Sequence, residues 1–280
     1  MSLVRFDNAL FGALTVFLSG ILSSDISGYF SEYIVAALSV LLLGMGSFAV
    51  NDYFDYKIDK ANNRTDRPIA QGSIGRKTAL YVGLAGLLLS VIVSLRLNQV
   101  VSSFLIFNAF VFFMYSYYLK KLFLIKNFIM AYGFLAMILV GTLVSDLVVE
   151  PLTMYYAIMG FIVGLAFEIM IDLRDMEGDR EFGISTLPLK TSPGFAASVS
   201  VSLYVLIMIL DPLPYFVNID SSLYHDPLFM IMIMVPVVLY VFVSKSLLKD
   251  ASKKNVLGLR ERTINIMQLG SFAYLLGYLL

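Results

Sequence analysis

The sequence predicts an all-α, polytopic membrane protein with nine transmembrane helices in a bundle. Of the 280 residues, 59% are hydrophobic and only 14% are charged, whereas a soluble domain carries roughly 25% charged residues. The apolar residues gather in segments that are long enough, or nearly long enough, to cross a bilayer. The basic residues are also confined to alternate connections between these segments, as in other polytopic proteins.

The apolar segments define the order of the expected helices. They cover roughly residues 8–24, 33–51, 78–95, 99–119, 127–145, 151–171, 195–210, 227–244 and 263–280. The seventh is shorter than the roughly 20 residues that a spanning helix needs, unless it continues toward Val217. We interpret the first as a retained helix and not as a removed signal peptide. No Gly/Pro-rich aqueous loop divides the chain, so we expect a single domain over residues 1–280.

The basic residues predict the topology. Of the 20 lysines and arginines, all but Arg96 lie at the connections on one side of the expected membrane. The positive-inside rule makes this side cytoplasmic, so the N-terminus is expected inside and the C-terminus outside the cell membrane. The second, fourth and sixth segments then all end on the cytoplasmic side.

Composition also excludes several classes of function. The chain has no cysteine, and His225 is its only histidine, which argues against a zinc or iron site built from these residues. The net charge is zero, so nothing in the overall charge indicates a nucleic-acid partner. No obligatory protein partner is evident.

Two acidic triads follow the second and sixth apolar segments. In each, the residues are spaced i, i+3, i+7, so on a helix they share one face. Acidic residues at membrane depth are functional candidates, and carboxylates that face each other favour a bound Mg²⁺ or Ca²⁺. The alternative is two solvated helix ends with a chance spacing, which the repetition disfavours. The triads are Asp52, Asp55 and Asp59, and Asp172, Asp175 and Asp179.

Basic side chains beside the first triad would suit a phosphate group. Arg67 lies in a loop that Pro68 and Gly72 predict to be a shaped turn, and arginine binds phosphate in a bidentate manner. An ordinary positive-inside loop is the alternative. Lys120 and Lys121, at the end of the fourth segment, either contact phosphate or anchor the helix in the membrane.

Other polar residues near the triads leave two interpretations open. Glu168 lies one turn before Asp172. A functional Glu168 would act as a base or hold an arginine, and the alternative is a pairing with a neighbouring helix that has no role in function. Tyr115 and Tyr117 lie near the expected site at the end of the fourth segment, but they also suit an aromatic belt at the membrane interface.

These motifs resemble those of the UbiA superfamily of intramembrane prenyltransferases. Asn51-Asp52-x-x-Asp55-x-x-x-Asp59 is similar to its first signature, and Asp172-x-x-Asp175-x-x-x-Asp179 to its second. The turn Asp66-Arg-Pro-Ile69 and Tyr115-Ser116 also fit. The forms Asn51-Asp-Tyr-Phe-Asp55 and Asp175-Met-Glu-Gly-Asp179 most resemble archaeal-type members that prenylate geranylgeranylglyceryl phosphate in ether-lipid biosynthesis.

The resemblance implies a bundle around a central cavity that binds Mg²⁺ and an isoprenyl diphosphate donor among membrane lipids. The implied metal ligands are Asp52, Asp55, Asp59, Asp175 and Asp179. Arg67 and Lys120 would assist departure of the diphosphate, and Asn51 would orient a metal ligand or a phosphate oxygen. Asp172 and Glu168 are further candidates for substrate binding, and Arg5 and Asn8 are weaker ones for acceptor or diphosphate. Tyr115 would stabilise the prenyl cation.

The implied reaction is geranylgeranyl transfer to the hydroxyl group of geranylgeranylglyceryl phosphate. Prenylation of an aromatic quinone precursor, such as 4-hydroxybenzoate or a naphthoate, by the same mechanism is one alternative. A cation or proton transporter with intramembrane carboxylates is another, although transporters usually place these groups near the bilayer midplane. A membrane phosphoalcohol transferase would need an Asp-Gly…Ala-Arg…Gly…Asp arrangement that the sequence lacks.

Overall fold

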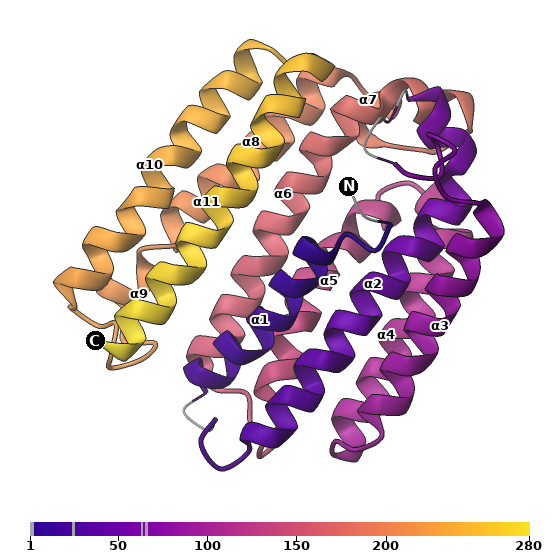
Figure 1. The fold of residues 1–280 in the computed structure, drawn as a ribbon. Coiled ribbons are helices and arrows are strands. Elements are labelled where there is room, and N and C mark those ends of the chain that lie inside the picture. Colours follow the sequence, from indigo (N-terminus) through magenta and orange to yellow (C-terminus); the bar gives the residue numbers. More distant parts are fainter. Residues whose placement is uncertain (1–2, 24–25, 63, 65–66) are drawn as a thin grey trace. The chain divides into compact units, whose positions relative to one another are not determined.

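The computed structural model describes residues 3–23, 26–62, 64 and 67–280, and the regular secondary structure of these residues is entirely helical, as predicted. Figure 1 shows the helices in chain order. They are α1 (Phe6–Leu22), α2 (Phe30–Ala61), α3 (Arg76–Ser94), α4 (Gln99–Tyr117), η1 (Leu119–Lys121), α5 (Ile125–Thr142), α6 (Pro151–Glu181), α7 (Leu187–Lys190), α8 (Pro193–Leu210), α9 (Leu213–Phe216), α10 (Pro227–Lys249) and α11 (Lys253–Leu279).

Within the described residues, seven segments are long and apolar enough to cross a membrane. They are α2, α3, α4, α5, α6, α10 and Pro193–Phe216, which joins α8 and α9. The seventh predicted segment therefore gains the length it lacked. α1 is apolar but has only 17 residues, and α11 begins with a basic stretch and carries polar residues in its apolar part. The polytopic fold class is supported, whereas the count of nine spans stays a prediction.

Both acidic triads lie on long helices that continue beyond their apolar segments. α2 has 32 residues and carries the first triad in its last three turns, because no glycine or proline interrupts the sequence from Phe48 to Ala61. α6 has 31 residues, begins with Pro151 at a position that suits proline, and carries the second triad near its end. The i, i+3, i+7 spacing therefore places each triad on one helix face, as predicted.

The chain forms two compact units. The first contains residues 1–129, 136–153 and 177–184, and the second contains residues 130–135, 154–176 and 185–280. The first unit thus holds the whole first triad together with Asp179, the last residue of the second triad. Asp172 and Asp175 belong to the second unit.

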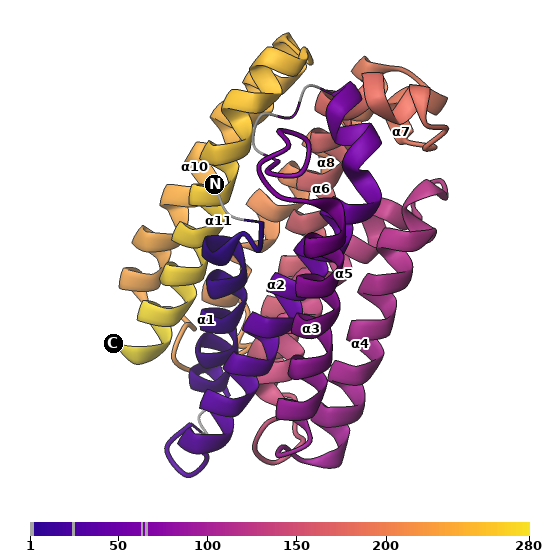
Figure 2. The same cartoon turned by 45° about the vertical axis from the view of Figure 1, so that its right-hand side comes forward.

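In the first unit, α2 packs against α1, α3 and α4, and Figure 2 shows α2, α3 and α4 side by side. The approach of α2 to α3 is close because glycines face each other. A Cβ atom on Gly46 would lie 2.6 Å from the backbone nitrogen of Leu87 and 2.9 Å from the oxygen of Gly83. The hydroxyl group of Ser90 donates to the oxygen of Ser39 at 2.7 Å in the same interface. Small residues of this kind let membrane helices pack closely.

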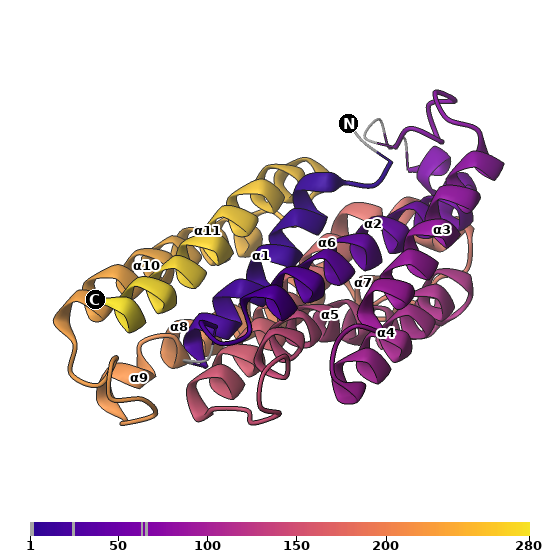
Figure 3. The same cartoon turned by 60° about the horizontal axis from the view of Figure 1, so that its bottom comes forward.

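In the second unit, α10 packs against α8 and α11, and α10 and α11 run side by side in Figure 3. Two tyrosines, the half-buried Tyr155 and the buried Tyr274, donate hydrogen bonds to the end of α8. The hydroxyl group of Tyr155 donates to the oxygen of Leu210 at 2.6 Å, and that of Tyr274 to the oxygen of Asp211 at 3.1 Å. Terminal carbonyl groups of a helix need such donors, so these tyrosines stabilise the end of α8.

Candidate active site

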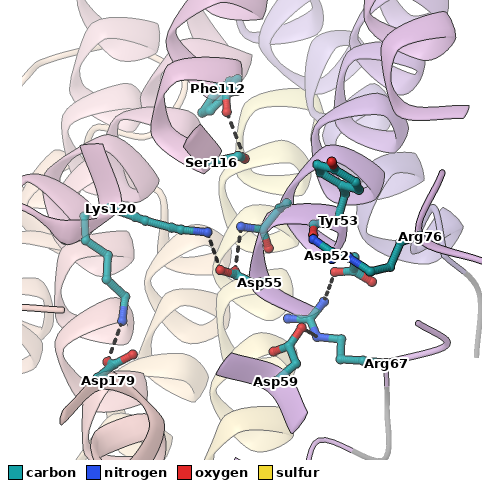
Figure 4. A network of polar contacts seen from close by, with 12 residues as sticks. Asp52, Tyr53, Asp55, Asp59, Arg67, Arg76, Phe112, Ser116, Lys120 and Asp179 are labelled. Carbon is teal, nitrogen blue, oxygen red and sulfur yellow. Dashed lines mark hydrogen bonds and ion pairs between the residues drawn. The ribbon is translucent and has the colours of Figure 1, made fainter. Parts of the chain in front are cut away.

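The end of α2 brings the first acidic triad among basic side chains (Figure 4). Asp52 is the most deeply placed of the three, with 1% of its surface exposed. Its Oδ1 atom accepts a hydrogen bond from Nη1 of Arg67 at 2.8 Å and a second one from Nη2 of Arg5. A buried carboxylate requires such compensation, so two guanidinium groups from distant segments converge on one aspartate.

Arg67 also reaches the end of the triad. Its Nε atom lies 3.6 Å from Oδ2 of Asp59, so one guanidinium group contacts carboxylates that lie seven residues apart on the same face of α2. The predicted turn positions this arginine. The backbone nitrogen of Ser73 donates to the oxygen of Pro68 at 3.0 Å, and Gly72 adopts a φ of 76°, which glycine tolerates without strain.

Asp55 has a different set of partners. Nζ of Lys120, in the short helix η1, forms an ion pair with Oδ1 of Asp55, and Nδ2 of Asn51 donates to Oδ2 at 2.9 Å. The side chain of Lys120 is only 6% exposed, whereas the adjacent Lys121 is exposed. The structure therefore brings Lys120 and Asn51 into the cluster and leaves Lys121 at the surface.

Asp179 is held by a lysine that sequence reasoning did not single out. Nζ of Lys126, at the beginning of α5, lies 3.1 Å from Oδ2 of Asp179. Both side chains are largely buried, and the backbone oxygen of Asp179 accepts from the nitrogen of Ile184 at 2.8 Å. The only available signal was that Lys126 belongs to the basic connection after the fourth apolar segment.

In the second unit, the remaining candidates lie along α6. Asp172 is fully buried, and Glu168, one turn earlier, is 9% exposed. Nε and Nη2 of Arg174 donate to the two carboxylate oxygens of Asp175 at 2.8 and 2.6 Å. Asp175 is therefore paired in a bidentate manner with its own neighbour in the chain.

The weaker candidates are placed less centrally. Asn8 is exposed, and its backbone nitrogen donates to the oxygen of Arg5 at 3.0 Å in the first turn of α1. Tyr115 is half-buried on α4. Tyr117 is 58% exposed and meets the ring of Phe54 edge-on at 5.7 Å, an environment that suits the interfacial belt.

The carboxylates fit magnesium by chemistry, although basic side chains already neutralise Asp52, Asp55 and Asp179. Within the described residues, no group of three or more His, Cys, Asp or Glu side chains is arranged to hold a metal ion. Mg²⁺ typically takes one or two carboxylates and completes its shell with water and phosphate oxygens, and this all-oxygen donor set suits it. A metal ion would share these carboxylates with the arginines and lysines, and a phosphate group is an alternative partner for the same basic side chains.

The site combines buried carboxylates with arginine and lysine side chains, on helices of a membrane-type fold. Such a site suits a phosphorylated substrate that also has an apolar part. Comparison with known proteins gives the family. Residues 12–260 match the UbiA prenyltransferase family, and the chain belongs to that family.

Similarity extends over almost the whole chain. A digeranylgeranylglyceryl phosphate synthase of Archaeoglobus fulgidus is 28% identical over 278 residues, which cover 98% of this chain and 93% of that protein. One of Pyrococcus furiosus is 34% identical over 190 residues, or 68% of this chain and 67% of that protein.

Solved structures show the same fold. One, described as that of a digeranylgeranylglyceryl phosphate synthase in membranes, has a TM-score of 0.74 at 25% identity and covers 99% of this chain and 96% of that one. A UbiA homologue of Archaeoglobus fulgidus bound to DMAPP and Mg²⁺ has a TM-score of 0.70 at 17% identity, and covers 99% of this chain and 97% of that one.

Proposed function

We propose that this protein is a Mg²⁺-dependent prenyltransferase. It transfers a geranylgeranyl group from geranylgeranyl diphosphate to the free hydroxyl group of geranylgeranylglyceryl phosphate, in ether-lipid biosynthesis. The observation that carries this proposal is similarity to digeranylgeranylglyceryl phosphate synthases over nearly the full length of both chains. The cluster of Arg5, Arg67, Lys120 and aspartates supports it, because an enzyme for diphosphates needs both kinds of charge.

The basic residues of the cluster are the proposed diphosphate contacts. Arg67 is placed to bind phosphate oxygens through a rigid guanidinium group, and Lys120 and Lys126 add positive charges close by. When the bond between C1 of the prenyl chain and the diphosphate oxygen breaks, these groups stabilise the charge on the departing diphosphate. The hydroxyl oxygen of the acceptor then bonds to C1 and releases its proton.

The carboxylates are the proposed metal ligands. We assign this role to Asp52, Asp55 and Asp59 of the first triad and to Asp175 and Asp179 of the second. Bound Mg²⁺ would neutralise the diphosphate and so favour its departure. Asn51, which contacts Asp55, keeps the role of orienting a metal ligand.

Further roles follow from the same assignment. We assign catalytic roles to Tyr115 and to Asp52, Asp55, Asp175 and Asp179. The ring of Tyr115 would stabilise the prenyl cation. Asp172 and Glu168 support the substrate from α6, and Asn8 contacts the acceptor at the start of α1. An apolar central cavity would keep water from the cation.

The acceptor carries its own phosphate, so it needs a basic contact beyond the diphosphate site. The side chain of Arg174 is only 7% exposed, which leaves little room for a second phosphate. Arg5 is better placed, because its side chain is 22% exposed while one nitrogen binds Asp52. We therefore assign the acceptor phosphate to Arg5 and to the exposed Lys121.

The proposal includes the membrane arrangement. The chain forms one domain with nine spans, in which α1 and α11 join the seven segments that qualify by length and composition. The N-terminus and both acidic motifs face the cytoplasm, and the C-terminus faces outward. The basic residues support this arrangement, since all but Arg96 fall on one side.

The decisive experiment supplies the purified protein, in lipid nanodiscs, with geranylgeranyl diphosphate, geranylgeranylglyceryl phosphate and Mg²⁺. We expect formation of the diether product and release of diphosphate, both abolished by chelation of the metal. Failure to form any prenylated product with lipid or aromatic acceptors would overturn the enzyme assignment. Proton or cation flux across proteoliposomes under the same conditions would favour the transporter alternative.

A further inference from the structure

The ends of the two motif helices are joined by a contact outside the acidic cluster. Asn62 ends α2, one turn after Asp59, and its surface is only 3% exposed. Its Oδ1 atom accepts a hydrogen bond from the backbone nitrogen of Gly178 at 2.8 Å, across 116 residues of sequence. Both residues belong to the first unit, so a backbone group next to Asp179 is fixed to the end of the first motif.

The fit between the two residues requires glycine. A Cβ atom at position 178 would lie 2.3 Å from Nδ2, 2.6 Å from Cγ and 2.8 Å from Oδ1 of Asn62. Glycine is among the least favourable residues inside a helix, and Gly178 lies inside α6 without a positive φ. The close approach of Asn62 gives a physical reason for glycine at this position.

The Asn62–Gly178 contact lies next to proposed metal ligands, but neither residue is itself a proposed ligand. Asn62 follows the first triad, and its backbone nitrogen donates to the oxygen of Ile58 at 2.9 Å, which closes the last turn of α2. Gly178 immediately precedes Asp179, whose carboxylate binds Lys126. A shift of Gly178 along α6 would therefore displace Asp179 from the cluster.

We infer that Asn62 is a positioning residue, which acts through the backbone of Gly178 to hold Asp179 at a fixed place beside the first triad. This inference rests on the proposed function. The Asn62–Gly178 contact makes no bond to substrate or metal. It fixes the geometry in which Asp179 and the first triad together bind the metal and the diphosphate.

The test is a double-mutant cycle of Asn62→Ala and Gly178→Ala. Gly178→Ala is expected to raise the Mg²⁺ concentration for half-maximal activity and the KM for geranylgeranyl diphosphate about tenfold. The KM for the acceptor should stay nearly unchanged. In the Asn62→Ala background, the added methyl group meets no Asn62 side chain, so Gly178→Ala should change the same constants less than threefold.

A second readout does not depend on turnover. Binding of inorganic pyrophosphate with Mg²⁺, measured by calorimetry in nanodiscs, should weaken about tenfold in each single variant and no further in the double variant. Gly258→Ala is the matched glycine control, because a Cβ atom there meets nothing within 4 Å. Asn98→Ala is the matched asparagine control, since Asn98 binds the oxygens of Leu143 and Val144 at 2.8 and 3.1 Å within the same unit.

Each outcome decides the question. If Gly178→Ala has the same effect in both backgrounds, the Asn62–Gly178 contact does not position the motif and the inference is wrong. If the variants lose only thermal stability and kcat in proportion, with both KM values unchanged, the contact is merely structural and the inference is again wrong. Absence of prenyl transfer by the wild-type protein would refute the proposed function instead, while the pyrophosphate-binding cycle would still test the contact.

Discussion

Lys120 and Asp55 form a largely buried ion pair that joins η1 to α2 across 65 residues of sequence. The lysine places a positive charge beside Asp55, a proposed metal ligand. If Asp55 holds Mg²⁺ as proposed, the ammonium group of Lys120 would be available to the diphosphate. The same side chain therefore neutralises Asp55 and is a candidate contact for the substrate diphosphate.

Replacement of Lys120 by methionine should consequently impair catalysis more than binding of the acceptor. We expect kcat/KM for the prenyl diphosphate to fall on the order of 100-fold, because one cationic contact to the leaving group is lost. With the acceptor at saturation, Lys121→Met, in the same turn but exposed, is the matched control and should change kcat/KM for the prenyl diphosphate less than about twofold. Equal losses in both variants, measured by diphosphate release, would show that only the general charge of this surface matters.

The carboxylates of both motifs should be needed together. Asp52→Asn and Asp179→Asn preserve the size of the side chain but remove the charge that a metal requires, so each should lower Mg²⁺-dependent prenyl transfer on the order of 100-fold or more. Asp250→Asn is the control, since Asp250 is exposed and its carboxylate accepts from the nitrogen of Ser252 at the start of α11. Near wild-type rates in both Asp52→Asn and Asp179→Asn would refute a shared site.

Much of this arrangement follows from sequence patterns. Hydropathy predicts the helices because each apolar segment must satisfy its own backbone in lipid, and the i, i+3, i+7 spacing places Asp52 and Asp55 on one face of α2. Pro68 and Gly72 likewise predict the turn that carries Arg67, since proline restricts the backbone and glycine permits conformations that other residues avoid.

Partners that depend on tertiary contact were beyond prediction. Lys126 meets Asp179 across 53 residues, and Asn62 meets Gly178 across 116, so no local spacing signals either contact. Their positions in the chain did not distinguish Lys120 from Lys121, and only the family resemblance favoured Lys120. Which of the two is buried depends on the rotation of the short helix η1. The number of spans also depends on α11, whose polar residues lower its hydropathy even though it forms a 27-residue helix.

The close packing of α2 on α3 should contribute to the stability of the fold independently of the residues proposed for prenyl transfer. Gly46→Leu forces a side chain against the backbone of α3, where a Cβ atom alone would lie 2.6 Å from a nitrogen atom. We expect a loss of at least about 1–3 kcal/mol, as for other overpacked interiors. Gly258→Leu in α11, which has open space around it, should leave the thermal unfolding temperature in detergent nearly unchanged. Equal thermal unfolding temperatures of the Gly46→Leu and Gly258→Leu variants would exclude tight packing at Gly46.

The proposed topology can be tested without removing any native thiol, because the chain contains no cysteine. Ser73→Cys and Ser222→Cys each place a thiol at an exposed position, in connections on opposite sides of the proposed membrane arrangement. In intact cells, an impermeant maleimide should label position 222 and should label position 73 only after the membrane is made permeable. Labelling in the reverse order would invert the arrangement.

The identity of the acceptor is the last prediction. A lipid acceptor with a phosphate group needs a basic contact beyond the diphosphate site. Arg5, at the start of α1, is the contact we propose, and in the structure it binds Asp52. An aromatic acid would need one contact to its carboxylate and a stacking wall. An alcohol is also a weak nucleophile, so the prenyl cation must be largely formed before attack. This demand agrees with the number of charged groups gathered around Asp52 and Asp55.

A competition assay separates these acceptors. The purified protein receives geranylgeranyl diphosphate and Mg²⁺ together with equal amounts of geranylgeranylglyceryl phosphate, 4-hydroxybenzoate and a naphthoate. We expect the ether product to dominate, and we expect Arg5→Gln to raise the KM for the lipid acceptor about tenfold or more, as loss of a charged contact does. Because Arg5 also binds Asp52, Lys121→Gln serves as the companion variant, with a smaller change in the same KM. Preferred transfer to an aromatic ring carbon would overturn the lipid assignment and leave the prenyltransferase assignment intact.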